Sequence, residues 1–307
     1  MQLPSRFRRS APDRLSLHTE PRSRGPSRRQ TRPVLVAGTA DVKIKHHVDV
    51  GTALDFAAVT RALETAGCVA ADEEAEELVQ TAHGDNGELR RMLARRLTGE
   101  PLAWITGRAN FCGLDVAIEP GVYVPRWQSE PLALMAARLL PPTGLGVDLC
   151  TGAGAIAMVM RSACPEARIV ATEIDPLAAN CARRNGLVVY EGDLDEPLPA
   201  ELASRVDVMT GVLPYVPHGS FHFLPRDVQR FEPRRALDGG EGGVEKISTV
   251  VRRSPRWIRS GGWLLLEIGN DQVAAVSAML AGSGYSDIDV LEDDDGDPRG
   301  VCGRLDP

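Results

Sequence analysis

A short apolar strand that runs directly into a glycine loop and an apolar helix constrains the fold of this chain more than any other feature. Residues 146–150 read Gly-Val-Asp-Leu-Cys, the loop continues as Thr-Gly-Ala-Gly, and an apolar helical run begins at residue 155. Further strand-like runs follow, separated by helical or loop segments, at residues 168–172, 187–190, 205–209 and 263–269. This alternation predicts an α/β fold in which helices cover both faces of a parallel sheet.

The glycine loop is expected to bind a ligand. Gly152 and Gly154 let the backbone turn sharply and approach a ligand where a Cβ would clash, and the helix that follows presents free N–H groups. Ligands of open α/β sheets bind at this edge, where the strands end. The loop reads Asp-x-Cys-x-Gly-x-Gly from residue 148, not the Gly-x-Gly-x-x-Gly of dinucleotide sites, and its carboxylate would repel a pyrophosphate.

Three acids in strand order indicate which ligand binds. Asp148 suits an α-amino group, Glu173 can accept hydrogen bonds from two ribose hydroxyls, and Asp193 can reach an adenine amino group. S-adenosyl-L-methionine carries these groups and a sulfonium, so we expect it to be the cofactor. Asp175 is expected to cap the next helix instead. The predicted cofactor-binding residues are Asp148, Cys150, Thr151, Gly152, Gly154, Glu173 and Asp193.

The composition and the hydrophobic periodicity divide the chain into four parts. Residues 1–46 form an Arg/Ser/Pro-rich tail that is expected to be disordered. Residues 47–103 form three short amphipathic helices, the third capped by Asn86. Residues 104–126 form a hairpin linker, and residues 127–307 form the cofactor-binding domain.

The tail leaves three alternatives open. Residues 1–32 carry nine arginines against Asp13 and Glu20, although the whole chain has a formal net charge of −7. The tail could be a nucleic-acid-binding arm, a transit peptide, or functionless sequence ahead of the true start. The acidic remainder of the chain predicts no direct nucleic-acid binding, which would need a basic face.

Other features exclude several classes of protein. The six cysteines are scattered without a Cys-x-x-Cys pair, so we expect reduced thiols, no structural zinc and no disulfide framework. No apolar run of about 18 residues occurs, so we expect no membrane span and a cytoplasmic location. The acidic run at residues 292–297 lacks the EF-hand spacing and is interpreted as a solvated hairpin turn. No metal site is predicted.

Several segments, in order along the chain, are similar to the signatures of one family. Residues 96–107, 111–116 and 120–126 match a linker signature, residues 148–157 match a cofactor loop, and residues 232–240 match a downstream signature. Over residues 55–305 the chain resembles the HemK/PrmC-type release-factor glutamine (N5) methyltransferases. Its variant residues look most like an actinobacterial-type side branch of protein-glutamine methyltransferases whose substrate is not established; these variants are Cys150, Phe111-Cys112-Gly113 and Val216-Pro217.

The resemblance implies a fold, an activity and a partner. It implies a class I (Rossmann-like) seven-stranded methyltransferase domain with S-adenosyl-L-methionine as cofactor, and a small N-terminal helical domain that recognises a protein substrate. The implied acceptor is the glutamine of a Gly-Gly-Gln motif in a peptide chain release factor.

The acceptor motif of the family is degenerate in this chain. Where the family has Asn-Pro-Pro-Tyr, this chain has Val212, Leu213, Pro214 and Tyr215, which the resemblance marks as the catalytic residues. In the family the Asn side chain and a backbone carbonyl accept hydrogen bonds from the amide protons, which helps to free the nitrogen lone pair. Val212 has no acceptor, so transfer to glutamine should be about 10²–10³ times slower unless another group substitutes.

Few groups near the motif could substitute for the asparagine. The backbone carbonyls of Val212 and Leu213 remain, Tyr215 can stack on a planar acceptor, and the nearby His218 and His222 are expected to be solvated. Two other functions stay open: a methyltransferase for another amine, amide or nucleic-acid base, and a non-catalytic cofactor-binding module.

Overall fold

The computed structural model describes residues 54–307. The predicted tail, residues 1–46, and the predicted start of the helical part, residues 47–53, lie outside the described residues.

From residue 54 onward, four helices precede the first described strand: α1 (Phe56–Thr65), α2 (Ala71–Thr81), α3 (Asn86–Arg96) and α4 (Leu102–Thr106). The first three share one apolar cluster, as their amphipathic pattern predicts. Asp85 caps α3 by accepting hydrogen bonds from the N–H groups of Gly87 and Glu88, so the expectation that Asn86 is the cap was wrong. Asn86 lies inside the helix, where its Oδ1 accepts a hydrogen bond from the Leu54 N–H over 3.0 Å.

A short antiparallel hairpin follows the helices. Strands β1 (Arg108–Phe111) and β2 (Leu114–Ala117) are joined by Cys112 and Gly113, which both have positive φ, at 49° and 77°. A two-residue turn with two positive φ angles matches the twist of paired strands. The Trp104 side chain in α4 anchors the segment beyond the hairpin, because its Nε1 donates a hydrogen bond to the Val122 carbonyl over 2.8 Å.

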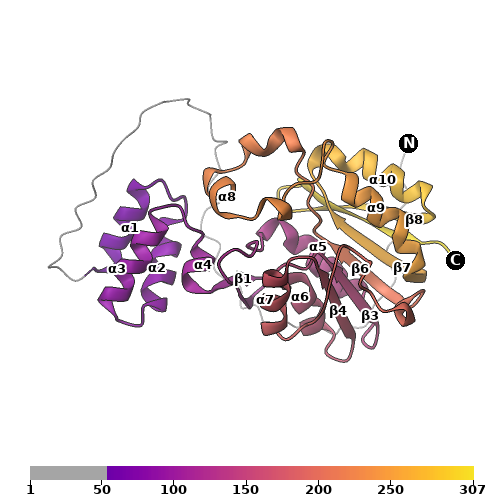
Figure 1. The fold of residues 1–307 in the computed structure, drawn as a ribbon, viewed down its shortest axis with the longest axis horizontal. Coiled ribbons are helices and arrows are strands. Elements are labelled where there is room, and N and C mark those ends of the chain that lie inside the picture. Colours follow the sequence, from indigo (N-terminus) through magenta and orange to yellow (C-terminus); the bar gives the residue numbers. More distant parts are fainter. Residues whose placement is uncertain (1–53) are drawn as a thin grey trace. The chain divides into compact units, whose positions relative to one another are not determined.

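The rest of the chain forms a seven-stranded sheet (Figure 1). Its order is β5-β4-β3-β6-β7-β9-β8, and the first five strands in this order are parallel. The strands are β3 (Leu145–Leu149), β4 (Arg168–Glu173), β5 (Val188–Glu191), β6 (Val206–Gly211), β7 (Ile258–Glu267), β8 (Tyr285–Glu292) and β9 (Pro298–Leu305). The strand order reverses between β3 and β6, and ligands bind at such a switch point.

The seven-stranded α/β fold is confirmed, but a fully parallel sheet is not. Strand β9 is antiparallel to both β7 and β8. A parallel crossover needs a dozen or more residues, whereas only residues 293–297 separate β8 from β9. The acidic run is therefore the turn of a hairpin.

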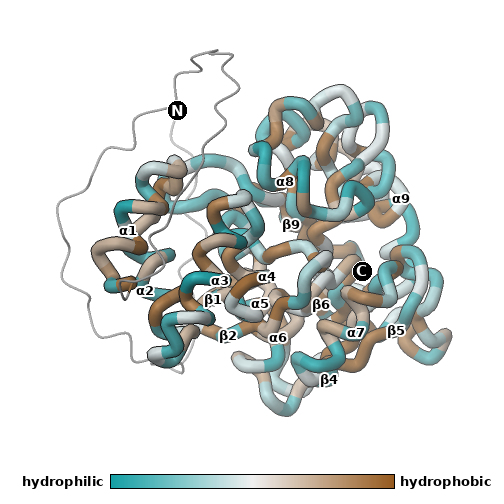
Figure 2. Tube along the Cα trace, turned by 60° about the vertical axis from the view of Figure 1, so that its left-hand side comes forward, coloured by the Kyte–Doolittle hydropathy of each residue, from teal (hydrophilic) through white to brown (hydrophobic). Residues whose placement is uncertain are grey.

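Helices pack on both faces of the sheet (Figure 1). On one face, one apolar core joins the sheet to α5 (Glu130–Leu139), α6 (Ala155–Ala163) and α7 (Pro176–Arg184). On the other face, a second core joins it to α9 (Glu245–Arg253) and α10 (Val273–Gly282). Figure 2 shows hydrophobic and hydrophilic stretches alternating along the helices, as expected when each helix buries one side.

A long connection between β6 and β7 lies at the carboxyl edge of the sheet. Its first part, residues 212–244, contains the short helix α8 (Arg226–Phe231) and two 3₁₀ turns, at His218–Phe223 and Arg234–Ala236, and α9 follows in its second part. The remaining 3₁₀ turns are Trp127–Ser129, Ala200–Leu202, Ser254–Arg256 and Asn270–Gln272. Among residues 54–307, no helix has the length and apolar character needed to cross a membrane.

Candidate functional site

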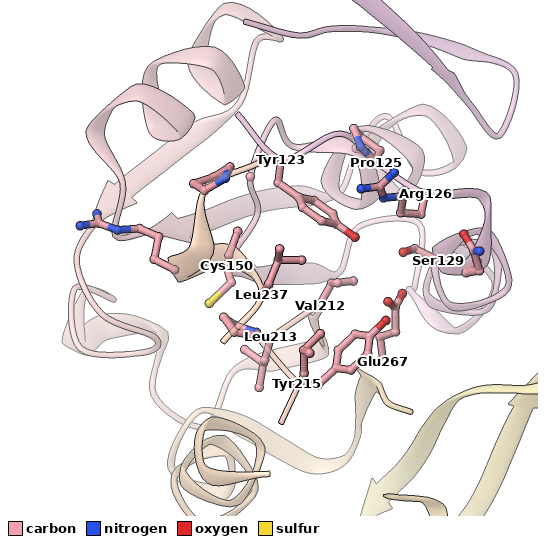
Figure 3. A pocket seen from close by; sticks show the side chains of 18 of the residues that line it. Tyr123, Pro125, Arg126, Ser129, Cys150, Val212, Leu213, Tyr215, Leu237 and Glu267 are labelled. Atoms are coloured by element: carbon pink, nitrogen blue, oxygen red, sulfur yellow. The ribbon is translucent and has the colours of Figure 1, made fainter. Parts of the chain in front are cut away.

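A cavity of about 400 Å³ opens where the parallel strands end (Figure 3). Its lining draws on the glycine loop after β3, the end of β4, the start of the connection after β6, and the end of β7. Of the residues predicted from the sequence, the cavity brings together Cys150, Gly152, Glu173, Val212, Leu213, Pro214 and Tyr215. Four predicted residues do not line it, namely Asp148, Thr151, Gly154 and Asp193.

The two loop glycines are required for different reasons. Both have the left-handed backbone, with φ of 57° at Gly152 and 91° at Gly154. A Cβ on Gly152 would meet no atom within 4 Å, so this glycine leaves open space beside the cavity. A Cβ on Gly154 would lie 2.2 Å from Cδ1 of Leu187. Gly152 therefore suits the close approach of a ligand, while Gly154 lets α6 begin against its neighbours.

Asp148 connects the glycine loop to a neighbouring strand through hydrogen bonds. Only 1% of it is exposed, and its two oxygens accept hydrogen bonds from the hydroxyls of Thr151 and Thr210, over 2.5 Å and 2.7 Å. Burial raises the pKa of this carboxyl to about 6, and the two hydroxyls oppose that shift. Asp148 thus ties the loop to β6. Its predicted contact with the ammonium group of the cofactor stays a prediction.

Glu173 joins the end of β4 to the glycine loop. Its Oε2 accepts a hydrogen bond from the Gly152 N–H and its Oε1 accepts one from the Asp175 N–H, each over 2.9 Å. Burial raises the pKa of Glu173, and the backbone donors act in the opposite direction. The oxygens of a carboxylate have further lone pairs that can accept hydrogen bonds from ligand hydroxyls. Asp175 caps α7 by accepting from the Leu177 N–H, which confirms its predicted role.

Asp193 lies apart from the cavity lining. Its carboxylate is half-exposed and lies 3.8 Å from the ammonium of Lys246 in α9. The predicted contact of Asp193 with an adenine amino group stays a prediction.

The altered acceptor motif forms one wall of the cavity. Val212 packs against the core that contains α5 and α6, whereas Leu213 is buried in the opposite core. The Tyr215 carbonyl accepts a hydrogen bond from Nε2 of Gln272 over 3.0 Å, which fixes the backbone of the motif. Neither His218 nor His222 lines the cavity; the His218 ring lies between Asp238 and Arg234.

Sequence reasoning missed a group of polar residues in the same cavity. Figure 3 shows Ser129, Tyr215 and Glu267 on one side of it, with Tyr123 reaching in beside them. Glu267, at the end of β7, is only 2% exposed. Burial raises its pKa, while the hydroxyls of Ser129 and Tyr215 interact with it and lower its pKa. The signal was present in the sequence, because Glu267 is a lone charge that follows three leucines in a buried strand.

A charged pair, Arg126 and Glu232, lies beside these residues. The Arg126 guanidinium forms an ion pair with the buried carboxylate of Glu232 and lies 5.3 Å from the ring centroid of Tyr123. Burial raises the pKa of Tyr123 to about 12, so its hydroxyl stays protonated at neutral pH.

The helical region contacts the segment that forms the cavity rim. The rings of Trp104 and Phe231 meet edge to face at 6.2 Å, and Arg230 donates a hydrogen bond to the Thr98 carbonyl over 3.2 Å. In the same segment, Leu224 and Val228 line the cavity. The segment that contains α8 therefore contacts the helical region and also lines the cavity.

Several known proteins with similar sequences share a name. Relatives from Geobacter sulfurreducens, Salmonella typhimurium and Mycolicibacterium smegmatis, all called release factor glutamine methyltransferase, are 35%, 34% and 35% identical to this chain. The matches cover 70%, 72% and 68% of this chain and 77%, 81% and 76% of those proteins. No protein-family model matches the chain.

Solved structures give only distant matches. A release-factor-specific protein-(glutamine-N5) methyltransferase from Alicyclobacillus acidocaldarius is 21% identical and aligns with a TM-score of 0.40, over 62% of this chain and 99% of that one. A methyltransferase from Pyrococcus furiosus is 17% identical and aligns with a TM-score of 0.47, over 71% and 99%.

Proposed function

Because this chain belongs to the family of release factor glutamine methyltransferases, we propose that it transfers a methyl group from S-adenosyl-L-methionine to the side-chain amide of a release-factor glutamine. One observation carries the proposal. A single cavity of about 400 Å³ contains both the glycine loop with Glu173 and the four residues at the acceptor-motif position.

The residues of one half of the cavity suit the methyl donor. The Glu173 carboxylate would accept hydrogen bonds from the ribose hydroxyls, and Gly152 leaves room for the ligand beside the loop. Ala178 in α7 and Leu237 give this half apolar walls. When bound, S-adenosyl-L-methionine supplies a methyl group activated by a sulfonium.

The other half of the cavity would position the acceptor amide. The backbone carbonyl of Leu213 can accept one amide proton, and the Tyr215 ring can flank the planar amide. Apolar neighbours such as Val212 and Leu224 exclude water from the reacting atoms. Positioning of this kind supplies much of the rate of a bimolecular transfer.

The remaining parts of the proposal concern the protein substrate. Residues 54–103, with their neighbours in the helical region, would recognise the release factor, because this region contacts the segment that forms the cavity rim. We propose the hairpin segment 104–126 as the linker and residues 127–307 as the catalytic domain. The proposed place of action is the cytoplasm, where translation terminates.

Single-turnover labelling tests the proposed function. A radioactive methyl donor is offered with a purified bacterial release factor, with nucleic acid, and with neither. Label in the release factor alone supports the proposal. Label in nucleic acid alone would replace it with base methylation, and donor binding without transfer to either acceptor would favour the non-catalytic module.

A further inference from the structure

Val212, which directly follows β6, and Glu267, the last residue of β7, lie at the ends of two adjacent parallel strands. The last paired residues of β6 and β7 are Gly211 and Leu266, so Val212 and Glu267 stand side by side one position further on. They also share one face of the sheet, because Val212 and Leu265 both belong to the core with α5 and α6. Both residues line the cavity, and Figure 3 shows the Glu267 carboxylate close to Tyr215.

One oxygen of Glu267 has no hydrogen-bond partner among the described residues. Its Oε2 is buried and makes no hydrogen bond to any of residues 54–307. The hydroxyls of Ser129 and Tyr215 interact with this carboxyl group, so we assign them to the other oxygen. Only 2% of Glu267 is exposed, although the residue lines the cavity.

No cation in the described part of the chain forms an ion pair with Glu267. The charges of Arg126 and Arg299 lower the pKa of Glu267 from a distance, but their direct ion pairs are with Glu232 and with Asp293, the second over 2.6 Å. A buried carboxylate with neither an ionic partner nor a full set of hydrogen bonds destabilises a fold. The contacts within the described residues leave Oε2 of Glu267 without a donor, and a donor supplied by a substrate would complete its hydrogen bonds.

We propose that the Glu267 carboxylate performs the task of the asparagine that is missing at position 212, by accepting a hydrogen bond from the acceptor amide N–H. This inference rests on the proposed function. The position fits, because the carboxylate reaches the cavity from the strand next to Val212 and on the same face. Together with the Leu213 carbonyl it gives the amide nitrogen two acceptors, the number that the family motif provides.

Bonds, electrons and protons all balance in the transfer when Glu267 accepts the proton. The amide nitrogen forms a bond to the methyl carbon as the carbon–sulfur bond breaks, and the electron pair of that bond stays on sulfur as a neutral thioether. The nitrogen then carries one proton too many. That proton passes along the existing hydrogen bond to the Glu267 carboxylate and from there to water, which regenerates the carboxylate.

The test combines substitutions at the two neighbouring positions. Glu267→Leu removes both oxygens, and Val212→Asn restores the acceptor of the family motif. Val212→Leu is the matched control, since it changes the same side chain without adding an acceptor. Single-turnover transfer to a release factor is measured for the wild type, for Glu267→Leu, and for Glu267→Leu combined with each change at Val212. Thermal melting and binding of S-adenosylhomocysteine are measured for every variant.

The inference predicts a specific pattern of non-additivity. Transfer by Glu267→Leu falls about 100-fold while S-adenosylhomocysteine binding stays within about threefold. Adding Val212→Asn to that variant restores transfer about tenfold or more, and adding Val212→Leu restores nothing. If Glu267→Leu melts too low to assay, Glu267→Met takes its place; it keeps the length of the side chain and has no oxygen that could accept the hydrogen bond.

Two outcomes separate the inference from the proposed function. A wild-type protein that methylates the release factor, with a Glu267 variant within about threefold of it, overturns the inference and leaves the proposed function standing. Equal rescue by Val212→Asn and Val212→Leu also overturns it. A wild-type protein that methylates no release factor overturns the proposed function, and the inference falls with it.

Discussion

The carboxylate of Glu173 accepts a hydrogen bond from the backbone N–H of Gly152 over 2.9 Å, which joins the end of β4 to the glycine loop. The ribose of the methyl donor would bind at this junction. Glu173→Ala should weaken binding of S-adenosyl-L-methionine and of S-adenosylhomocysteine by about 10- to 100-fold, because charge-assisted hydrogen bonds are lost. Calorimetry measures both affinities.

The control for this prediction is Glu166→Ala. Glu166 is exposed and precedes the opposite end of the same strand, β4. It should leave both affinities unchanged. Equal affinities for the wild type and Glu173→Ala would show that the ribose binds elsewhere.

The two glycines of the loop should respond differently to alanine. Gly154→Ala places a methyl group against Leu187 and strains a left-handed backbone, so it should lower the free energy of unfolding by about 2–5 kcal/mol. Gly152→Ala has open space around the new methyl group and should cost only about 1–2 kcal/mol, while weakening donor binding. Denaturant unfolding and calorimetry on both variants check this. Equal losses of stability in the two variants would contradict the conclusion that Gly154 is needed for packing and Gly152 for the approach of a ligand.

The stability of the protein should depend on pH through Asp148. Its pKa is raised from 3.8 to about 6 by burial, so the folded state holds this proton more tightly than the unfolded state does. The resulting stabilisation is fully present below about pH 4 and is lost as the pH rises through about 6. Asp148→Asn cannot ionise and should lack this decrease.

Denaturant unfolding without ligand, between about pH 4 and pH 7.5, measures the effect. The difference in unfolding free energy between the wild type and Asp148→Asn should change with pH in favour of the variant as the pH rises. A constant difference would show that Asp148 titrates normally.

The Arg/Ser/Pro-rich tail should be dispensable for folding. Its composition offers little apolar surface to bury, so removal of residues 1–41 should leave the melting temperature and the donor affinity unchanged. Loss of cooperative melting in the truncated protein would show that the tail contributes to the fold.

Patterns that are local in sequence predicted most of the fold. The strand–glycine–helix run around Gly152 and the alternation after it predicted the parallel strands, because each depends on residues close together in the chain. The hairpin turn at residues 292–297 was predicted, but the antiparallel pairing of β9 with β7 was not. A turn is a local feature, whereas this pairing depends on contacts between residues far apart in the chain, such as Leu265 and Cys302.

The candidate site was predictable only in part. The loop and Glu173 follow from the order of the strands, but the position of Glu267 beside Val212 depends on the register between β6 and β7, which are separated by more than 40 residues. The hydrogen bonds of Asp148 also depend on a distant residue, because the Thr210 hydroxyl donates a hydrogen bond to one of its carboxylate oxygens. Contacts between strands far apart in the chain leave no periodic signal in the sequence.

Localisation of the transferred methyl group tests the central claim most directly. The wild-type protein is incubated in single turnover with a purified release factor and S-adenosyl-L-methionine, and the peptide that contains the Gly-Gly-Gln motif is sequenced by mass spectrometry. A release factor with asparagine in place of that glutamine is the matched acceptor control. We predict one added methyl group on the glutamine side chain and none on the control. A release factor that remains unmodified, or a methyl group that persists when the glutamine is replaced, would contradict the account.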